Sequence, residues 1–142
     1  MFLTTRGRYA VAAIIDIIIY SKDNSPVSLS QISLRQSISI SYLEQIFLLL
    51  KKNNIVKSIK GPGGGYILAK DAKKITLSDL LSASGEKVKM TKCHNNEGCS
   101  GLKSKCLTHH IWQSFEDKIE NYLSGISLEE MTQISANSFL KQ

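Results

Sequence analysis

All three cysteines of this 142-residue chain lie close together, in a polar segment that also contains two glycines. They are followed by a histidine, and the spacing is Cys93-x5-Cys99-x6-Cys106-x2-His109. Thiolates and imidazoles are the ligands that zinc and iron–sulfur clusters prefer. We therefore interpret this segment as a metal-binding loop, and these residue types leave both kinds of centre open.

Disulfide bonds explain the cysteines less well, because their number is odd and no secretory signal precedes them. The apolar run from Tyr9 to Tyr20 follows two arginines and superficially looks like a signal peptide. However, Asp16 interrupts the run, no small-residue cleavage site follows it, and it is too short to cross a bilayer. We interpret it as a buried helix of a cytoplasmic protein that does not enter a membrane.

Charge is distributed unevenly along the chain. The formal net charge is +6, of which residues 1–75 contribute +7 and residues 76–142 contribute −1. A basic half next to a nearly neutral half favours a nucleic-acid-binding module joined to a second functional segment. The apolar content of 42% is typical of a globular domain.

The first half shows the pattern of a winged helix. Apolar periodicity predicts three helices, 8–20, 29–36 and about 41–52, and capping boxes at Ser28–Gln31 and Ser41–Glu44 mark the starts of the last two. Two strands, 55–59 and 66–68, follow around a Lys-Gly-Pro-Gly-Gly-Gly turn. A short helix, a turn and a longer helix form a helix-turn-helix, and the hairpin after it is the wing. No Gly-Lys-Ser/Thr follows the glycines, so they do not form a phosphate-binding loop.

The second half predicts a dimer. A helix should begin near residue 77 and pack on the first helix, and a last short helix should follow Ser127. Between them, residues 108–123 form a long helix with one apolar stripe, which consists of Ile111, Trp112, Phe115, Ile119 and Tyr122. Little sequence remains to cover this stripe, so we expect a second copy of the chain to do so.

The predicted fold class is therefore mainly α with a small β-hairpin. We expect a winged helix-turn-helix domain over 1–84, a metal-binding loop over 85–107, and a dimerisation helix with a C-terminal segment over 108–142. The expected DNA contacts lie at the start of the third helix, on the wing and at the N-terminus: Arg6, Arg8, Ser39, Ser41, Tyr42, Glu44, Gln45, Lys57, Lys60, Gly63 and Gly64. No paired carboxylates or nucleophile–base set is present, so we do not expect an enzyme.

Several motifs make a resemblance specific. They are Leu3–Ala10, Ser41–Gln45, Gly61–Tyr66, Cys106–His109 with Trp112, and Ile126–Leu128. In these motifs and their order, over about residues 1–130, the chain resembles the IscR family of bacterial iron–sulfur cluster regulators.

The resemblance implies a homodimeric transcription regulator with one [2Fe-2S] cluster per subunit, which binds a palindromic operator and controls cluster-assembly genes. It also implies Cys93, Cys99, Cys106 and His109 as the ligands, although the second gap is one residue longer than in the best-known members. His94 and His110 are competing imidazoles. On a helix His110 would point about 100° away from His109, whereas Cys106 and His109 share a face.

Alternative functions remain at this stage. The related NsrR nitric-oxide sensors are similar over the same length, but they are thought to ligate a [4Fe-4S] cluster partly through an aspartate in the first helix. The matching residue here is Arg8, which cannot ligate iron. A winged helix with a structural zinc, and an iron–sulfur carrier or enzyme with a basic half, are the other candidates.

Overall fold

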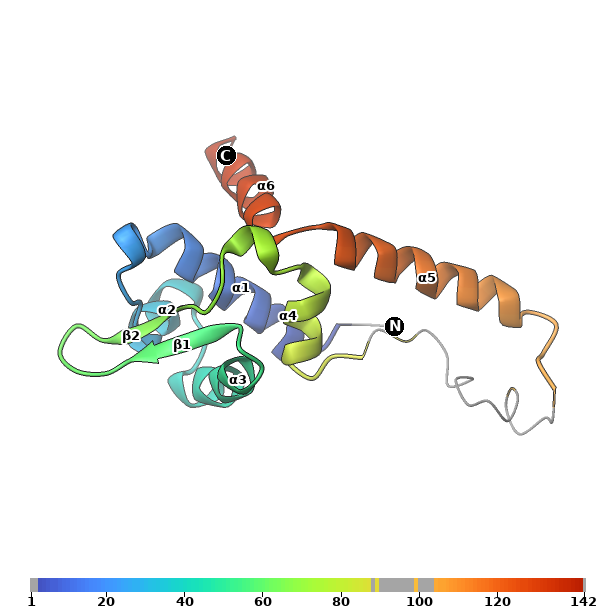
Figure 1. Cartoon of the computed structure of the whole chain (residues 1–142), viewed down its shortest axis with the longest axis horizontal. Coiled ribbons are helices and arrows are strands. Elements are labelled where there is room, and N and C mark those ends of the chain that lie inside the picture. Colours follow the sequence, from blue (N-terminus) through green and yellow to red (C-terminus); the bar gives the residue numbers. More distant parts are fainter. Residues whose placement is uncertain (1–2, 88, 90–98, 100–103, 142) are drawn as a thin grey trace.

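The computed structural model describes residues 3–87, 89, 99 and 104–141 (Figure 1). In chain order the elements are α1 (Thr5–Tyr20), the 3-10 turn η1 (Lys22–Asn24), α2 (Leu29–Gln36), α3 (Ile40–Lys52), β1 (Val56–Ile59), β2 (Gly65–Leu68), the 3-10 turn η2 (Ala72–Lys74), α4 (Leu77–Ala83), α5 (His109–Gly125) and α6 (Leu128–Leu140). The predicted class, mainly α with one hairpin, is confirmed. No helix among the described residues is long and apolar enough to span a bilayer.

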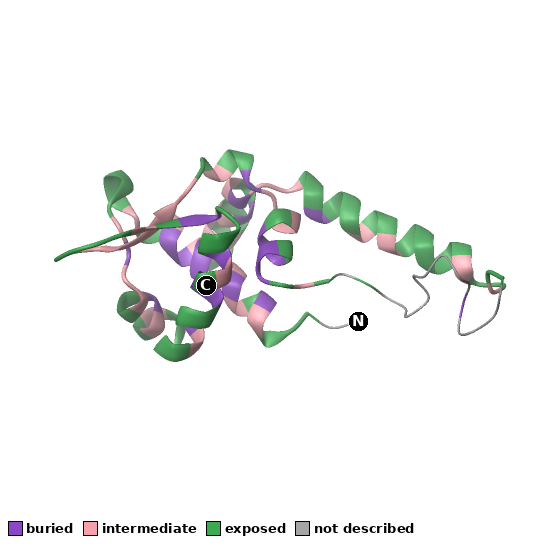
Figure 2. Ribbon diagram, turned by 60° about the horizontal axis from the view of Figure 1, so that its bottom comes forward, coloured by how far each residue is buried: buried purple, intermediate pink, exposed green. Residues whose placement is uncertain are grey.

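Helix α1 lies at the centre of the core. Ala13, Ile14 and Ile17 on α1 are buried together with Ile46 and Phe47 on α3. Helices α2, α3 and α4 all pack on α1 (Figure 1), which confirms the predicted return of the fourth helix to the first. The buried residues gather where these helices meet (Figure 2). The core therefore fixes the helix-turn-helix relative to one central helix.

Two helix starts differ from the predictions because a neighbouring residue provides the cap. The hydroxyl of Ser39 accepts a hydrogen bond from the backbone N–H of Tyr42 at 3.3 Å, so α3 begins at Ile40. The predicted cap at Ser41 is therefore wrong, and Ser39 has the extended backbone that an N-cap requires. Helix α1 begins three residues earlier than predicted, since Thr4 caps it. This first turn is polar and adds nothing to the apolar periodicity.

The hairpin forms the predicted wing. Strands β1 and β2 are antiparallel, with register from Val56↔Leu68 to Ile59↔Gly65. The other edge of β2 pairs briefly with Val27, through two backbone hydrogen bonds of 3.0 and 2.8 Å to Tyr66. At the tip, a Cβ on Gly64 would lie 2.3 Å from the carbonyl oxygen of Ile59, so this position cannot hold a side chain without moving the turn.

The turn between α2 and α3 contains a strained residue. Ser37 has φ 55° and ψ 42°, in the left-handed region that glycine adopts more readily. We expect Ser37→Gly to raise the free energy of unfolding by about 0.5–1 kcal/mol, because relief of strain exceeds the added entropy of the unfolded chain. Denaturant titration measures the effect. Ser37→Ala is the control, because it retains the strain; an equal gain in that variant would locate the effect in the lost hydroxyl.

The last two helices differ in their packing. The C-terminal end of α5 packs on α4, where Leu123 is its buried residue, and the rest of the helix extends away from the other helices (Figure 1). Helix α6 is longer than the predicted short helix and returns to α1, where Leu128 and Met131 join the core. A β-bridge between Thr76 and Ser127 fixes this return next to α4.

Candidate DNA interface and candidate metal centre

The outer face of α3 presents the residues expected to read bases. Ser41, Glu44 and Gln45 are exposed, whereas the opposite face of the same helix is buried through residues such as Leu43 and Phe47. Glutamine can pair with adenine in the major groove, and a carboxylate can accept from cytosine while repelling phosphates. These three side chains are free to meet a duplex without any change in the core.

Two other predicted contact residues have structural roles at the same helix end. The hydroxyl of Ser39 caps α3. The ring of Tyr42 packs edge-on against Tyr9 of α1, with ring centroids 5.7 Å apart, and is half-buried. Both residues therefore help to fix the first turn of α3 against α1.

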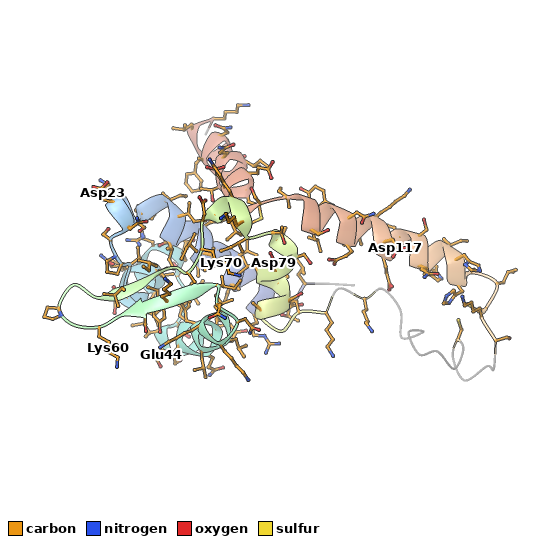
Figure 3. All side chains as sticks on the ribbon, viewed as in Figure 1. Asp23, Glu44, Lys60, Lys70, Asp79 and Asp117 are labelled. Atoms are coloured by element: carbon orange, nitrogen blue, oxygen red, sulfur yellow. The ribbon has the colours of Figure 1, made fainter. Side chains whose placement is uncertain are left out.

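The wing carries two exposed basic side chains, Lys57 and Lys60. Figure 3 shows Lys60 near the same lower edge of the view as Glu44 of α3. Gly63 has φ 72°, which only glycine adopts without strain, and nothing lies within 4 Å of the Cβ position at this glycine. The bare backbone of the tip can therefore approach a phosphate closely.

The N-terminal arginines lie in a different environment. The guanidinium of Arg6 lies against Gly85, and its buried Nε has no hydrogen-bond partner among the described residues. Arg8 is exposed and borders an apolar groove of about 340 Å³, which is otherwise lined by Leu3, Val11, Leu77, Leu81, Ile119 and Leu123. Both arginines are thus next to elements that lead into or out of the cysteine segment.

At the start of α5 the side chains of two expected metal ligands, Cys99 and His109, are in contact, and a third, Cys106, contacts Cys99. The Sγ of Cys99 lies 3.2 Å from Nδ1 of His109, and Cys99 is buried. The half-buried Cys106 lies 3.6 Å from the hydroxyl of Thr108, and it also interacts with Cys99. Cys93 and the competing His94 lie outside the described residues.

The donors present suit a metal or cluster. A sulfur and a nitrogen bound tetrahedrally to one metal ion would be about 3.6 Å apart, close to the observed separation of Cys99 and His109. The hydrogen bonds from Thr108 and then from Cys99 lower the pKa of the Cys106 thiol, which favours the thiolate that binds metals. No three Cys, His, Asp or Glu side chains form a complete metal-binding group within the described part of the chain.

Sequence reasoning missed a polar link beside these ligands. The indole Nε1 of Trp112 donates to the hydroxyl of Thr108 at 3.1 Å, and the same hydroxyl meets the Sγ of Cys106. The first turn of α5 is therefore connected through one threonine to a predicted ligand. The spacing of Thr108 and Trp112, one helical turn, was the available signal.

The helix-turn-helix with its adjacent wing defines a winged-helix protein. The family described as Rrf2, iron-dependent transcriptional regulator, matches residues 3–134, and the chain belongs to this family. Among curated relatives, the HTH-type transcriptional regulator IscR of Photorhabdus laumondii is 50% identical over 131 residues, which cover 92% of this chain and 79% of the relative. The IscR of Xenorhabdus nematophila is 48% identical over the same coverage.

Solved structures agree on the fold. T. potens IscR matches with a TM-score of 0.77 and 30% identity, covering 95% of this chain and 88% of that one. CymR (YrzC), the global cysteine regulator of B. subtilis, gives a TM-score of 0.81 at 24% identity, covering 94% and 98%. The chain is thus a DNA-binding transcriptional regulator of the IscR type, a non-enzymatic role that the sequence predicted.

Proposed function

We propose that this regulator senses iron–sulfur cluster status and adjusts its DNA binding accordingly, with cluster-assembly genes as its targets. The observation that carries the proposal is the thiol–imidazole pair of Cys99 and His109 at the first turn of α5. The proposed cofactor is one [2Fe-2S] cluster per subunit, held by these two residues with Cys93 and Cys106. The protein would act in the cytoplasm, where its DNA target lies.

The donor set suits a sensor. Bound there, the cluster would supply a centre whose assembly and loss follow iron supply and oxidation. Replacing one thiolate by a neutral imidazole removes a negative charge and raises the reduction potential. In the division proposed from the sequence, a DNA-binding unit over 1–84, a loop over 85–107 and a dimer segment over 108–142, the three cysteines lie in the loop and His109 begins the dimer helix.

The proposed assembly is a homodimer on a palindromic operator. The stripe on α5 is largely exposed in the single chain, with Ile111 at 61%, Phe115 at 47% and Tyr122 at 63%. It continues through Ile119 into the apolar groove beside α1 and α4. A second copy would cover this surface and set two reading helices at a fixed spacing.

We further propose that α3 reads bases and the wing contacts phosphates, and we expect the corresponding substitutions to differ in kind. Gln45→Ala should weaken the free energy of binding to the preferred duplex by roughly 1–3 kcal/mol and change binding to a scrambled duplex little, because base contacts determine sequence specificity. Lys60→Ala should weaken binding to both duplexes equally and reduce the salt dependence, because phosphate contacts release counterions. Titrations at two salt concentrations measure both effects.

Glu44→Ala should broaden the range of sites bound, since it removes a carboxylate that rejects mismatched bases.

Lys22→Ala is the control for the positive charge lost in Lys60→Ala, because Lys22 is exposed on η1, outside α3 and the wing. It should change the affinity for either duplex less than Lys60→Ala does. Equal proportional losses for Gln45→Ala and Lys60→Ala on both duplexes would contradict the assignment of α3 as the reading helix.

The cluster itself is tested by the absorption spectrum of protein purified without oxygen, together with iron and sulfide analysis. We expect visible bands and about two irons and two sulfides per chain, as a [2Fe-2S] centre requires. A colourless protein that contains zinc would contradict the proposal of a cluster sensor and would indicate a structural metal site instead. Four irons per chain would indicate the larger cluster of the nitric-oxide sensors.

A further inference from the structure

A buried carboxylate joins α1 to the end of α2. Asp16 lies within α1 and is 1% exposed. Among the residues that the structure describes, Asp16 and Ser84 are the buried residues with polar side chains. A carboxylate in an apolar interior is strongly unfavourable unless an opposite charge and hydrogen bonds compensate for lost hydration. The partners of Asp16 therefore decide how α1 and α2 fit together.

Those partners are the last two residues of α2. The Nε of Arg35 donates to Oδ2 of Asp16 at 3.0 Å, and Nη2 donates to Oδ1 at 2.7 Å. The side-chain amide of Gln36 adds a third hydrogen bond to Oδ2 at 2.8 Å. A two-point fork fixes direction as well as distance, which a single ion contact does not.

An aromatic ring one helical turn further along α1 completes the arrangement. The guanidinium carbon of Arg35 lies 4.0 Å from the ring centroid of Tyr20, within range of a cation–π contact. The hydrogen bond to Asp16 is the main reason that the pKa of Arg35 is raised, so the guanidinium stays charged. Arg35 is thus held between two side chains of α1.

Apolar packing fixes the C-terminal half of α2 weakly. This helix has 8 residues; Ile32 is its one buried residue, and Leu29 is partly buried against the same core. Both apolar contacts lie in the first half of the helix, whereas Leu34 is 85% exposed, so the fork anchors the end that leads into the turn before α3. The hydroxyl of Ser33 then donates to the carbonyl of Ile38 at 2.6 Å, which ties α2 to the turn before the α3 cap at Ser39.

We propose that Asp16 and Arg35 are positioning residues for DNA reading: their ion pair sets the orientation of α2 and the first turn of α3, and through it sequence specificity. The inference rests on the proposed reading of bases by α3. Replacing a buried ion pair by neutral side chains of similar volume often leaves a fold as stable as before. The signature of positioning is therefore lost specificity, not lost folding.

The test uses the full chain with Asp16→Asn and Arg35→Met together, so that neither charge is left without its partner. Affinities are measured for the preferred duplex, selected from a random pool, and for a scrambled duplex, well below the unfolding temperature. We expect about a tenfold loss on the preferred duplex and less than about a twofold change on the scrambled one, the pattern of a displaced base contact. Arg35→Lys keeps the charge without the fork, and it should lower the ratio of the affinity for the preferred duplex to that for the scrambled duplex in the same direction. This single variant provides the test if the double variant does not fold.

Met131→Ala is the stability control, because Met131 is a buried core residue of α6 that takes no part in this ion pair. It should lower the unfolding temperature and leave the ratio of the two affinities unchanged. If the Asp16 and Arg35 variants behave in the same way, these residues only stabilise the fold and the proposal is overturned. Gln45→Ala tests the reading helix separately: an unchanged ratio there would refute base reading by α3, whichever result the ion-pair variants give.

Discussion

Cys106→Ala should abolish binding of the proposed cluster while the winged helix and the proposed dimer remain intact. The thiol of Cys106 is a proposed ligand, and the residue is half-buried outside the apolar core. Its loss removes a ligand that alanine cannot replace, whereas substitutions away from packed sites usually change stability by only about 0.5 kcal/mol. Iron and sulfide per chain, the visible spectrum, circular dichroism and sedimentation measure the separate parts of this prediction.

Ser104→Ala is the matched control. Ser104 lies in the same segment, and its contact with Cys99 is made by its backbone carbonyl, at 3.3 Å from the Cys99 N–H. Removal of its hydroxyl should therefore leave the iron content unchanged. If Cys106→Ala unfolds the protein instead, the site holds the fold together and the proposal of a sensor loses its basis.

His109→Cys should keep a cluster and make it harder to lose, because a fourth thiolate binds iron more strongly than an imidazole. The lability of the parent would then reside in one ligand, which the rate of iron release under air measures. Equal release rates for parent and variant would place the lability elsewhere in the segment.

Local sequence patterns predicted the elements wherever a cap and an apolar face coincide. The capping box at Ser28–Gln31 forms as predicted, and the helix predicted to begin near residue 77 is capped by a second box, Thr76–Asp79. In each box the two side chains and the backbone N–H groups they bind lie within one helical turn. At α3 both Ser39 and Ser41 fit the pattern of a cap. The choice between them depends on backbone angles that tertiary packing sets, so the sequence alone could not decide it.

The candidate metal centre could be predicted only where its residues are close together in the sequence. Cys106 and His109 are near in sequence, and the closeness of Cys99 to His109 follows from a short connection. The pairing of Asp16 with Arg35 spans 19 residues and depends on how α2 packs on α1. The only available signal was an acidic residue on an otherwise apolar helix face, which indicates a partner without identifying it.

Paired charges at Ile111 and Phe115 should convert the proposed dimer to monomers. Both residues lie on the apolar stripe of α5, and Ile111→Glu with Phe115→Glu would bury two carboxylates in a seam without partners. Sedimentation measures the change. Because a monomer engages only one half-site, affinity for the palindromic duplex should fall by at least about tenfold, while affinity for a single half-site should stay near that of the parent.

The control adds the same charge to the opposite side of α5. Gln113 and Ser124 are exposed and lie about half a turn around the helix from the stripe. Gln113→Glu with Ser124→Glu should leave the dimer intact, so the two double variants separate the position of the charges from their number. Dimers that survive the stripe variant would move the interface away from Ile111 and Phe115, and the apolar groove lined by Leu77, Leu81 and Leu123 would then have to accept a different surface of the second copy.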